Sequence, residues 1–158
     1  MDATPIIAEL EMKRAAGWTL PRLKELAVSL LHESNPRFHW TGIYELFPDN
    51  TLRLGPFLGA ATDHVFIGMG QGVCGTAVAE RRNINVPDVT QVENYLACST
   101  ETRSELVVLI RSGERIHGQI DIDSHEPAAF DDTAEREVQK VADFLAPRYE
   151  AWTKGRVA

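Results

Sequence analysis

The sequence lacks the features that mark secreted and membrane proteins. Among 158 residues it has two cysteines, Cys74 and Cys98, too few for the disulfide framework of a small secreted domain. No apolar run approaches the roughly 20 residues that a membrane helix needs. The first residues carry acids where a secretory signal has bases, and no long apolar stretch follows them. We therefore expect a cytoplasmic protein with no membrane partner.

Positive charge is also scarce. Sixteen Lys and Arg stand against 23 Asp and Glu, which gives a formal net charge of −7. Binding of nucleic acid requires clustered positive charge, so this composition argues against a nucleic-acid partner. The chain shows no repeat, linker or low-complexity tract. Its length is typical of one domain, and we expect a single domain over residues 1–158.

Hydrophobic periodicity predicts helices near both ends of the chain and strands between them. Apolar residues recur at helical spacing within 5–16, from Leu23 to Leu31 and from Asp131 to about Trp152. Alternating β-branched and aromatic residues predict strands at 38–47, 51–57, 65–67, 84–86, 104–111 and 115–123, with a short helix at 73–80. Residues 88–103 are polar and predict a long loop, whose length fits a lid.

This order of elements indicates an α+β fold, an antiparallel β-sheet flanked by N- and C-terminal helices. We expect the N-terminal helices at about 3–34, the sheet core at about 37–124 and the C-terminal helix at about 131–152.

The two cysteines are candidate reactive groups. Cys74 follows a glycine-rich loop and begins a short helix. A helix N-terminus favours the thiolate and lowers a thiol pKa, but a small buried cysteine is the more common role. Cys98 lies in the polar loop, where reactive groups concentrate on a rigid scaffold. Their separation of 24 residues is too wide for a C-x-x-C motif. No set of histidines is spaced for a zinc site, and we expect neither a metal nor a cofactor.

Three acids form a second candidate group. Asp121 and Asp123 alternate with isoleucines and therefore share one face of a strand. Glu105 begins the preceding strand and can lie beside them across the hairpin. Two interpretations stay open: a solvated face of the sheet, or a binding site for an ammonium group.

Two aromatic residues are a third candidate group. Trp40 and Tyr44 are four residues apart on the first predicted strand and point to the same face. Such residues are usually part of the core. The alternative is an aromatic box over an apolar or sulfur-bearing substrate.

Taken together, several segments resemble one family, the free methionine-(R)-sulfoxide reductases, which are stand-alone GAF-domain enzymes. The similarity runs from about Trp18 to Leu145. The segments that carry it are Trp40-Thr-Gly-Ile-Tyr44, Leu54-Gly-Pro-Phe57, Gly70-Gln-Gly-Val-Cys74-Gly-Thr-Ala77, Ala97-Cys98, Ser104-Glu105 and Gly118-Gln-Ile-Asp121-Ile-Asp123-Ser124.

The resemblance implies a role for each candidate residue. Cys98 matches the cysteine that attacks the sulfoxide sulfur, releases methionine and becomes a sulfenic acid. Cys74 matches a second cysteine, which condenses with that sulfenic acid into a disulfide for reduction by thioredoxin. The acids Glu105, Asp121 and Asp123 match residues that hold the substrate ammonium and assist protonation of the sulfoxide oxygen.

The resemblance implies two further expectations. Trp40 and Tyr44 match aromatic residues that surround the methyl-sulfinyl end of free L-methionine (R)-sulfoxide. A homodimer with packed N-terminal helices is also implied.

Three positions depart from the family pattern. His64 stands where many members carry a third cysteine that resolves the sulfenic acid, and Gly68 and Ile110 replace prolines. Loss of the third cysteine leaves two alternatives to the reductase open. One is a small-molecule sensor that keeps the pocket without turnover, although the chain has no room for an output domain. The other is a redox switch in which Cys74 and Cys98 form a disulfide without substrate.

Overall fold

An antiparallel six-stranded sheet forms the centre of the molecule. The computed structural model describes residues 1–93, 95 and 100–157, except the side chains of 154–157. The strands lie in the order β3-β2-β1-β6-β5-β4. Their bounds are Trp40–Leu46 for β1, Thr51–Leu58 for β2, Phe66–Gly68 for β3, Ile84–Val86 for β4, Ser104–Ser112 for β5 and Arg115–Ser124 for β6. The antiparallel sheet confirms the predicted fold class, and each strand lies within about two residues of its predicted bounds.

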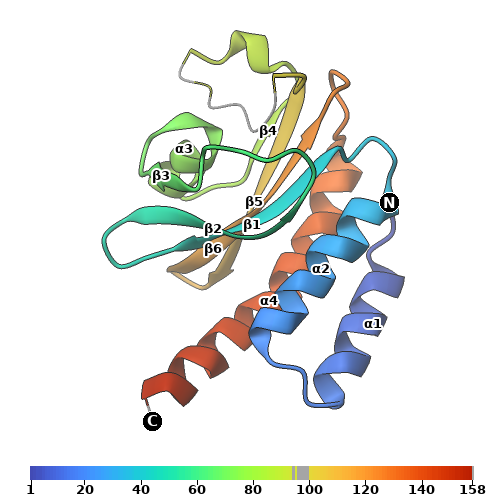
Figure 1. Ribbon diagram of the computed structural model, residues 1–158, viewed down its shortest axis with the longest axis vertical. Coiled ribbons are helices and arrows are strands. Elements are labelled where there is room, and N and C mark those ends of the chain that lie inside the picture. Colours follow the sequence, from blue (N-terminus) through green and yellow to red (C-terminus); the bar gives the residue numbers. More distant parts are fainter. Residues whose placement is uncertain (94, 96–99, 158) are drawn as a thin grey trace.

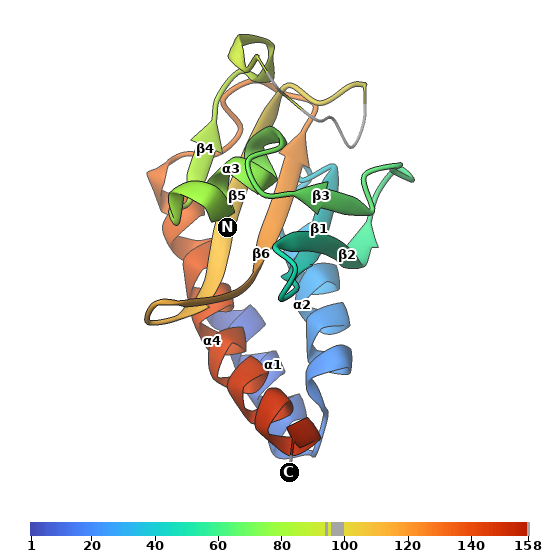
Figure 2. The ribbon, with the colours of Figure 1, turned by 90° about the vertical axis from the view of Figure 1, so that its left-hand side faces the viewer.

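Three helices cover one face of this sheet, and a short helix lies on the other. The covering helices are α1 (Thr4–Ala15), α2 (Leu20–Ser34) and α4 (Asp132–Val157), as Figures 1 and 2 show. Helix α3 (Gly72–Glu80) lies on the opposite face (Figure 2). Helix α4 extends five residues past its predicted end. Trp152, one turn after Tyr149, still packs against the core, so the apolar stripe continues.

The sheet separates two hydrophobic clusters. On the helical side, Ile120 and Ile122 of β6 pack with buried residues of α1, α2 and α4. On the side of α3, Val107 and Leu109 of β5 pack with residues of α3 and β1. Because neighbouring residues on a strand point to opposite faces, Asp121 lies on the α3 side. The helical side is therefore a continuous apolar core, and the polar residues of β6 gather on the other side.

The segment after β4 is closed at its base by backbone hydrogen bonds. It begins with a 3-10 turn, η1 (Val89–Gln91), which the Asp88 side chain caps by accepting from the Thr90 amide. The Val89 amide donates to the Arg103 carbonyl at 2.9 Å, and the Arg103 amide donates to the Ser124 carbonyl at 2.8 Å. Both ends of this loop are thus fixed beside the end of β6.

None of the helices in the described part of the chain is both long enough and apolar enough to span a bilayer.

Replacement of Gly118 by alanine should destabilise the sheet. Gly118 pairs with Glu45 across β1 and β6, and an added Cβ would overlap the Tyr44 carbonyl oxygen. The backbone atoms cannot move aside without opening the β1–β6 pairing. We therefore expect the free energy of unfolding to fall by at least about 3 kcal/mol, the upper end for overpacking. Thermal melts measure this loss of stability. Gly113→Ala is the control, because its Cβ meets nothing within 4 Å and costs only its positive φ of 57°, about 1 kcal/mol. Equal melting temperatures for the two variants would contradict this assignment.

Candidate functional site

The three predicted acids lie together on the α3 side of the sheet. Glu105 of β5 stands directly opposite Asp123 of β6, and Asp121 is the next residue of β6 on that face. Their exposures are 2% for Glu105, 0% for Asp121 and 1% for Asp123. The solvated-face interpretation is therefore wrong. These carboxyl groups are buried because α3 covers the face on which they stand, as the buried Cys74 of α3 in contact with Glu105 shows.

Burial and mutual repulsion make these carboxyl groups hold a proton more tightly than ordinary acids do. Burial raises the pKa of Glu105 well above its ordinary value, and the charges of Asp121 and Asp123 raise it further. Burial also raises the pKa of Asp121, whereas its polar contacts with Glu105 and Cys74 act in the opposite direction. Of these two acids, Glu105 is accordingly the one that keeps its proton to the higher pH.

Cys74 of α3 covers the acid cluster. It lies in the first turn of α3, is 5% exposed, and its thiol donates to Oε1 of Glu105 at 3.7 Å. Gly75 lets α3 pack closely against the turn that precedes it, because a Cβ there would lie 3.1 Å from the Gly70 amide nitrogen. The buried-cysteine interpretation of Cys74 is correct as to its burial, and the thiol also contacts the Glu105 carboxyl group.

Cys74, Glu105 and Asp121 also have the geometry to hold a cation. Their sulfur and carboxylate oxygens lie within 4.8 Å of one another, the one such group with three members within the described ranges. Sulfur and oxygen ligands suit a divalent transition metal. An ammonium group fits the same place, since it needs only several acceptors around a positive charge.

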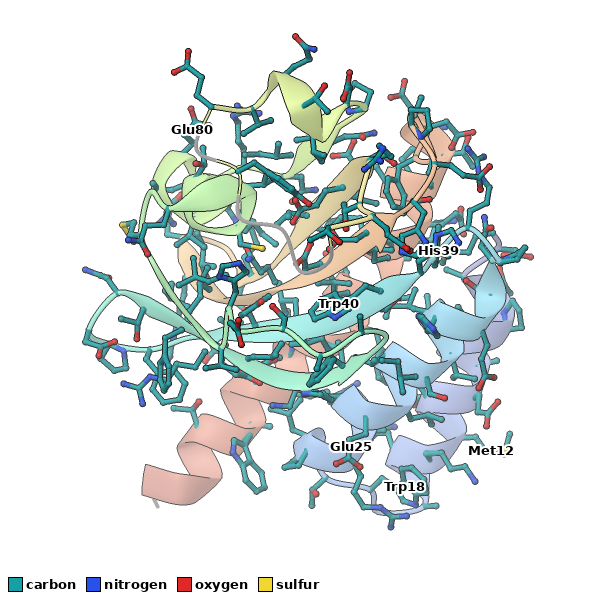
Figure 3. All side chains as sticks on the ribbon, turned by 45° about the horizontal axis from the view of Figure 1, so that its top comes forward. Met12, Trp18, Glu25, His39, Trp40 and Glu80 are labelled. Atoms are coloured by element: carbon teal, nitrogen blue, oxygen red, sulfur yellow. The ribbon has the colours of Figure 1, made fainter. Side chains whose placement is uncertain are left out.

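The two predicted aromatic residues flank the acids on β1. Trp40 pairs with Asp123, and Gly42 pairs with Asp121. The rings of Trp40 and Tyr44 stack at 6.4 Å between centroids, and Trp40 stacks on Phe57 at 5.6 Å. Figure 3 shows Trp40 on β1 near the centre of the molecule, away from Met12 of α1 and from Trp18 between α1 and α2. The core interpretation is correct as to burial. The side chains also border the acids, and the aromatic-box interpretation stays a prediction.

Each of these aromatic residues is fixed by a hydrogen bond. Trp40 Nε1 donates to the Ala60 carbonyl at 3.0 Å, and the Tyr44 hydroxyl donates to the His64 carbonyl at 2.8 Å. Gly42 leaves room for the indole, because a Cβ there would lie 2.7 Å from Cζ3 of Trp40. The segment before β3, which includes His64, is thereby attached to the aromatic wall.

Cys98 lies outside the described residues, so its predicted role stays a prediction. Sequence reasoning missed two described residues of this region. Gln119 is fully buried on β6 between Tyr44 and Leu109, and alternation with Asp121 could have identified it. Tyr95 packs against the cluster on the α3 side, and the only sequence signal for it was its place in the polar loop.

Comparison with known proteins identifies the family. The chain matches the GAF domain over residues 11–148. It is 37% identical over 113 residues to the free methionine-R-sulfoxide reductase of Escherichia coli, covering 72% of this chain and 67% of that protein. The chain belongs to the free methionine-R-sulfoxide reductases of the GAF family.

Solved structures agree with this membership. The type II free methionine-R-sulfoxide reductase of Thermoplasma acidophilum matches with a TM-score of 0.79 and 38% identity, over 84% of this chain and 93% of that one. The Neisseria meningitidis free methionine-R-sulfoxide reductase, solved in complex with its substrate, matches with a TM-score of 0.86 and 31% identity, over 94% and 89% of the two chains. The predicted enzyme class of this GAF reductase is thereby confirmed.

Glu105→Gln should stabilise the protein, and increasingly so as the pH rises. In the unfolded chain Glu105 ionises near its ordinary pKa of 4.5, whereas the folded protein keeps the proton to higher pH. The unfolded state then binds fewer protons than the folded state, so wild-type stability falls across that window. Glutamine removes this loss, which is about 1.4 kcal/mol for each unit by which the folded pKa is raised.

Thermal melts at pH 5 and pH 8 measure the effect, with Glu114→Gln as the control because Glu114 is 97% exposed. An equal difference between Glu105→Gln and wild type at both pH values would contradict the buried proton.

Proposed function

We propose that this chain reduces free L-methionine (R)-sulfoxide to methionine. The observation that carries the proposal is the buried cluster of Glu105, Asp121 and Asp123 with the Cys74 thiol upon it. Relatives named for this activity, one solved with its substrate, support the substrate class. Stability alone does not account for three adjacent buried acids, since mutual repulsion and desolvation both disfavour them.

The acids bind the substrate ammonium. An amino acid brings one positive charge on its ammonium group, and three carboxyl groups that hold one proton present two negative charges toward it. Asp121 and Asp123 are the ionised partners, because Glu105 is the group whose pKa is raised furthest. A free amino group is thereby required, which selects the free amino acid over methionine sulfoxide inside a polypeptide.

Protonated Glu105 supplies the proton that the sulfoxide oxygen needs. The Cys98 thiolate attacks the sulfinyl sulfur while the oxygen is protonated, and the oxygen then passes to the cysteine sulfur. The balance is one thiol and one sulfoxide giving one sulfenic acid and one thioether. The wall formed by Trp40 and Tyr44 accepts the methyl-sulfinyl end, for which aromatic rings are favourable partners of sulfur.

Cys74 resolves the sulfenic acid. Its thiol and the Cys98 sulfenic acid condense to a disulfide and one water, and Glu105 is placed to take the thiol proton, because the thiol already donates to it at 3.7 Å. A thioredoxin-type dithiol then reduces the disulfide to two thiols. This assignment gives Cys74 the role that the third family cysteine has elsewhere, since His64 occupies that position.

The remaining expectations complete the proposal. The enzyme is a single domain over residues 1–158 that works in the cytoplasm without a cofactor, and two copies associate through the N-terminal helices. Helices α1 and α2 pack on α4 and leave Met12 of α1 64% exposed, which places an apolar side chain on the face that a second copy would cover.

Substitution of the cysteines tests the mechanism. Cys98→Ser should abolish turnover, because the thiolate that attacks the sulfinyl sulfur is lost. Cys74→Ser should release one methionine per chain and then stall with thioredoxin. Methionine released over time with thioredoxin and its reductase measures both variants. Full-rate cycling of Cys74→Ser would show that another thiol resolves the sulfenic acid.

Asp121→Asn should weaken ligand binding. The substitution removes a charge-assisted hydrogen bond to the ammonium, which contributes about 1.5–3 kcal/mol. Titration calorimetry with L-methionine measures the loss, and Asp49→Asn on the exposed β1–β2 turn is the control. An unchanged affinity in Asp121→Asn and also in Glu105→Gln would remove the ammonium site.

A further inference from the structure

Tyr95 adds a partly buried phenol ring to the site, from the loop that also carries Cys98 in the sequence. Its ring packs against the hydrophobic cluster that includes Trp40, Tyr44 and Cys74. Its hydroxyl oxygen is buried and makes no hydrogen bond of normal geometry with a described residue, although the Thr102 side chain is a close polar neighbour. A buried polar atom left without a partner costs about 1–3 kcal/mol. Such an atom beside a binding site is explained most simply by a bond that a ligand completes.

The negative charges of the site reach this phenol. Burial raises the pKa of Tyr95 far above its ordinary value, and the neighbouring acid cluster of Glu105, Asp123 and Asp121 raises it further. The phenol therefore stays neutral and keeps its proton at every physiological pH. It can donate a hydrogen bond beside three acids, where an arginine would pair with the acids instead.

Hydrogen-bond donors are scarce in this site, although the substrate brings oxygen atoms that need them. Trp40 and Tyr44 already donate to the backbone carbonyls of Ala60 and His64, and Cys74 donates to Glu105. The buried donors on this side that lack a partner in the described part of the chain are the Tyr95 and Thr102 hydroxyls and the Gln119 amide. Thr102 adjoins the Tyr95 phenol, and Gln119 lies between Tyr44 and Leu109.

We propose that the Tyr95 hydroxyl donates a hydrogen bond to the α-carboxylate of the substrate, and that Tyr95 thereby determines specificity for the free amino acid. The inference rests on the proposed function, because it takes the ammonium to lie on the acids. The ammonium and the carboxylate share one carbon atom, so acids that bind the ammonium also fix the carboxylate next to themselves. Tyr95 packs against the hydrophobic cluster that includes Cys74, and Cys74 contacts Glu105, so the phenol lies on the side of the sheet that carries the acids.

The sulfinyl group belongs at the other end. It is separated from the α-carbon by two methylene groups, and the ring of Trp40 extends over Gly42 toward Tyr44, away from Asp123 along β1. Tyr95 therefore contributes to binding of the amino-acid end and leaves the chemistry at sulfur to Glu105 and Cys98.

Binding of two ligands to Tyr95→Phe tests the proposal. L-methionine carries the carboxylate, and 3-(methylthio)propylamine has the same ammonium and thioether without it. We expect Tyr95→Phe to weaken the binding of L-methionine by about 10- to 100-fold, as for loss of a hydrogen bond to a charged group. The binding of the amine should weaken by less than about threefold. Titration calorimetry gives both dissociation constants. Equal losses for the two ligands, or no loss for L-methionine, would overturn the proposal.

A matched variant controls for loss of a phenol. The Tyr149 hydroxyl donates to Glu45 at 3.1 Å on the helical side of the sheet, so Tyr149→Phe should leave both dissociation constants unchanged. The two proposals also fail separately. If the wild type binds L-methionine but forms no methionine from methionine sulfoxide, the reductase proposal fails. The dissociation constants of L-methionine and of the amine still decide the role of Tyr95 in that case.

Discussion

The burial of three carboxyl groups on one face of the sheet is the constraint on which the rest of the structure depends. Glu105 and Asp123 are paired across β5 and β6, with Asp121 beside them, and none is more than 2% exposed. Such a cluster is tolerable only if it shares a proton and receives a cation. In the mechanism we propose, the same cluster provides an acid for the sulfoxide oxygen and a binding site for an ammonium group. The thiol of Cys74 bonds directly to it.

Stability comes mainly from the other face. There α1, α2 and α4 bury a continuous apolar core against Ile120, Ile122 and their neighbours, and each buried aliphatic side chain contributes about 1.5–3 kcal/mol. That apolar layer offsets the cost of the acids and of the donors that lack partners in the described part of the site. The division follows from strand alternation, because the isoleucines and the aspartates of β6 cannot share a face. Function and stability are in this way assigned to opposite sides of one sheet.

The fold and most of the site were predictable from local patterns. Alternation identified the acids of β6, and periodicity identified the helices. Burial of the acids was not predictable, because it depends on α3, a helix distant in sequence whose Cys74 covers Glu105. Tyr95 and Gln119 were missed for a similar reason: neither stands in a motif, and each matters through a neighbour distant in sequence. The end of α4 was also missed, since the helix continues from Trp152, its expected limit, to Val157.

A single-turnover assay tests the central claim most directly. Reduced protein is mixed with the (R) or the (S) epimer of free L-methionine sulfoxide without a reductant, and the methionine formed and the thiols remaining are counted. The account predicts about one methionine per chain from the (R) epimer alone, with loss of both Cys74 and Cys98 thiols. Absence of methionine in a protein that binds L-methionine tightly would contradict it and would make this chain a binding module.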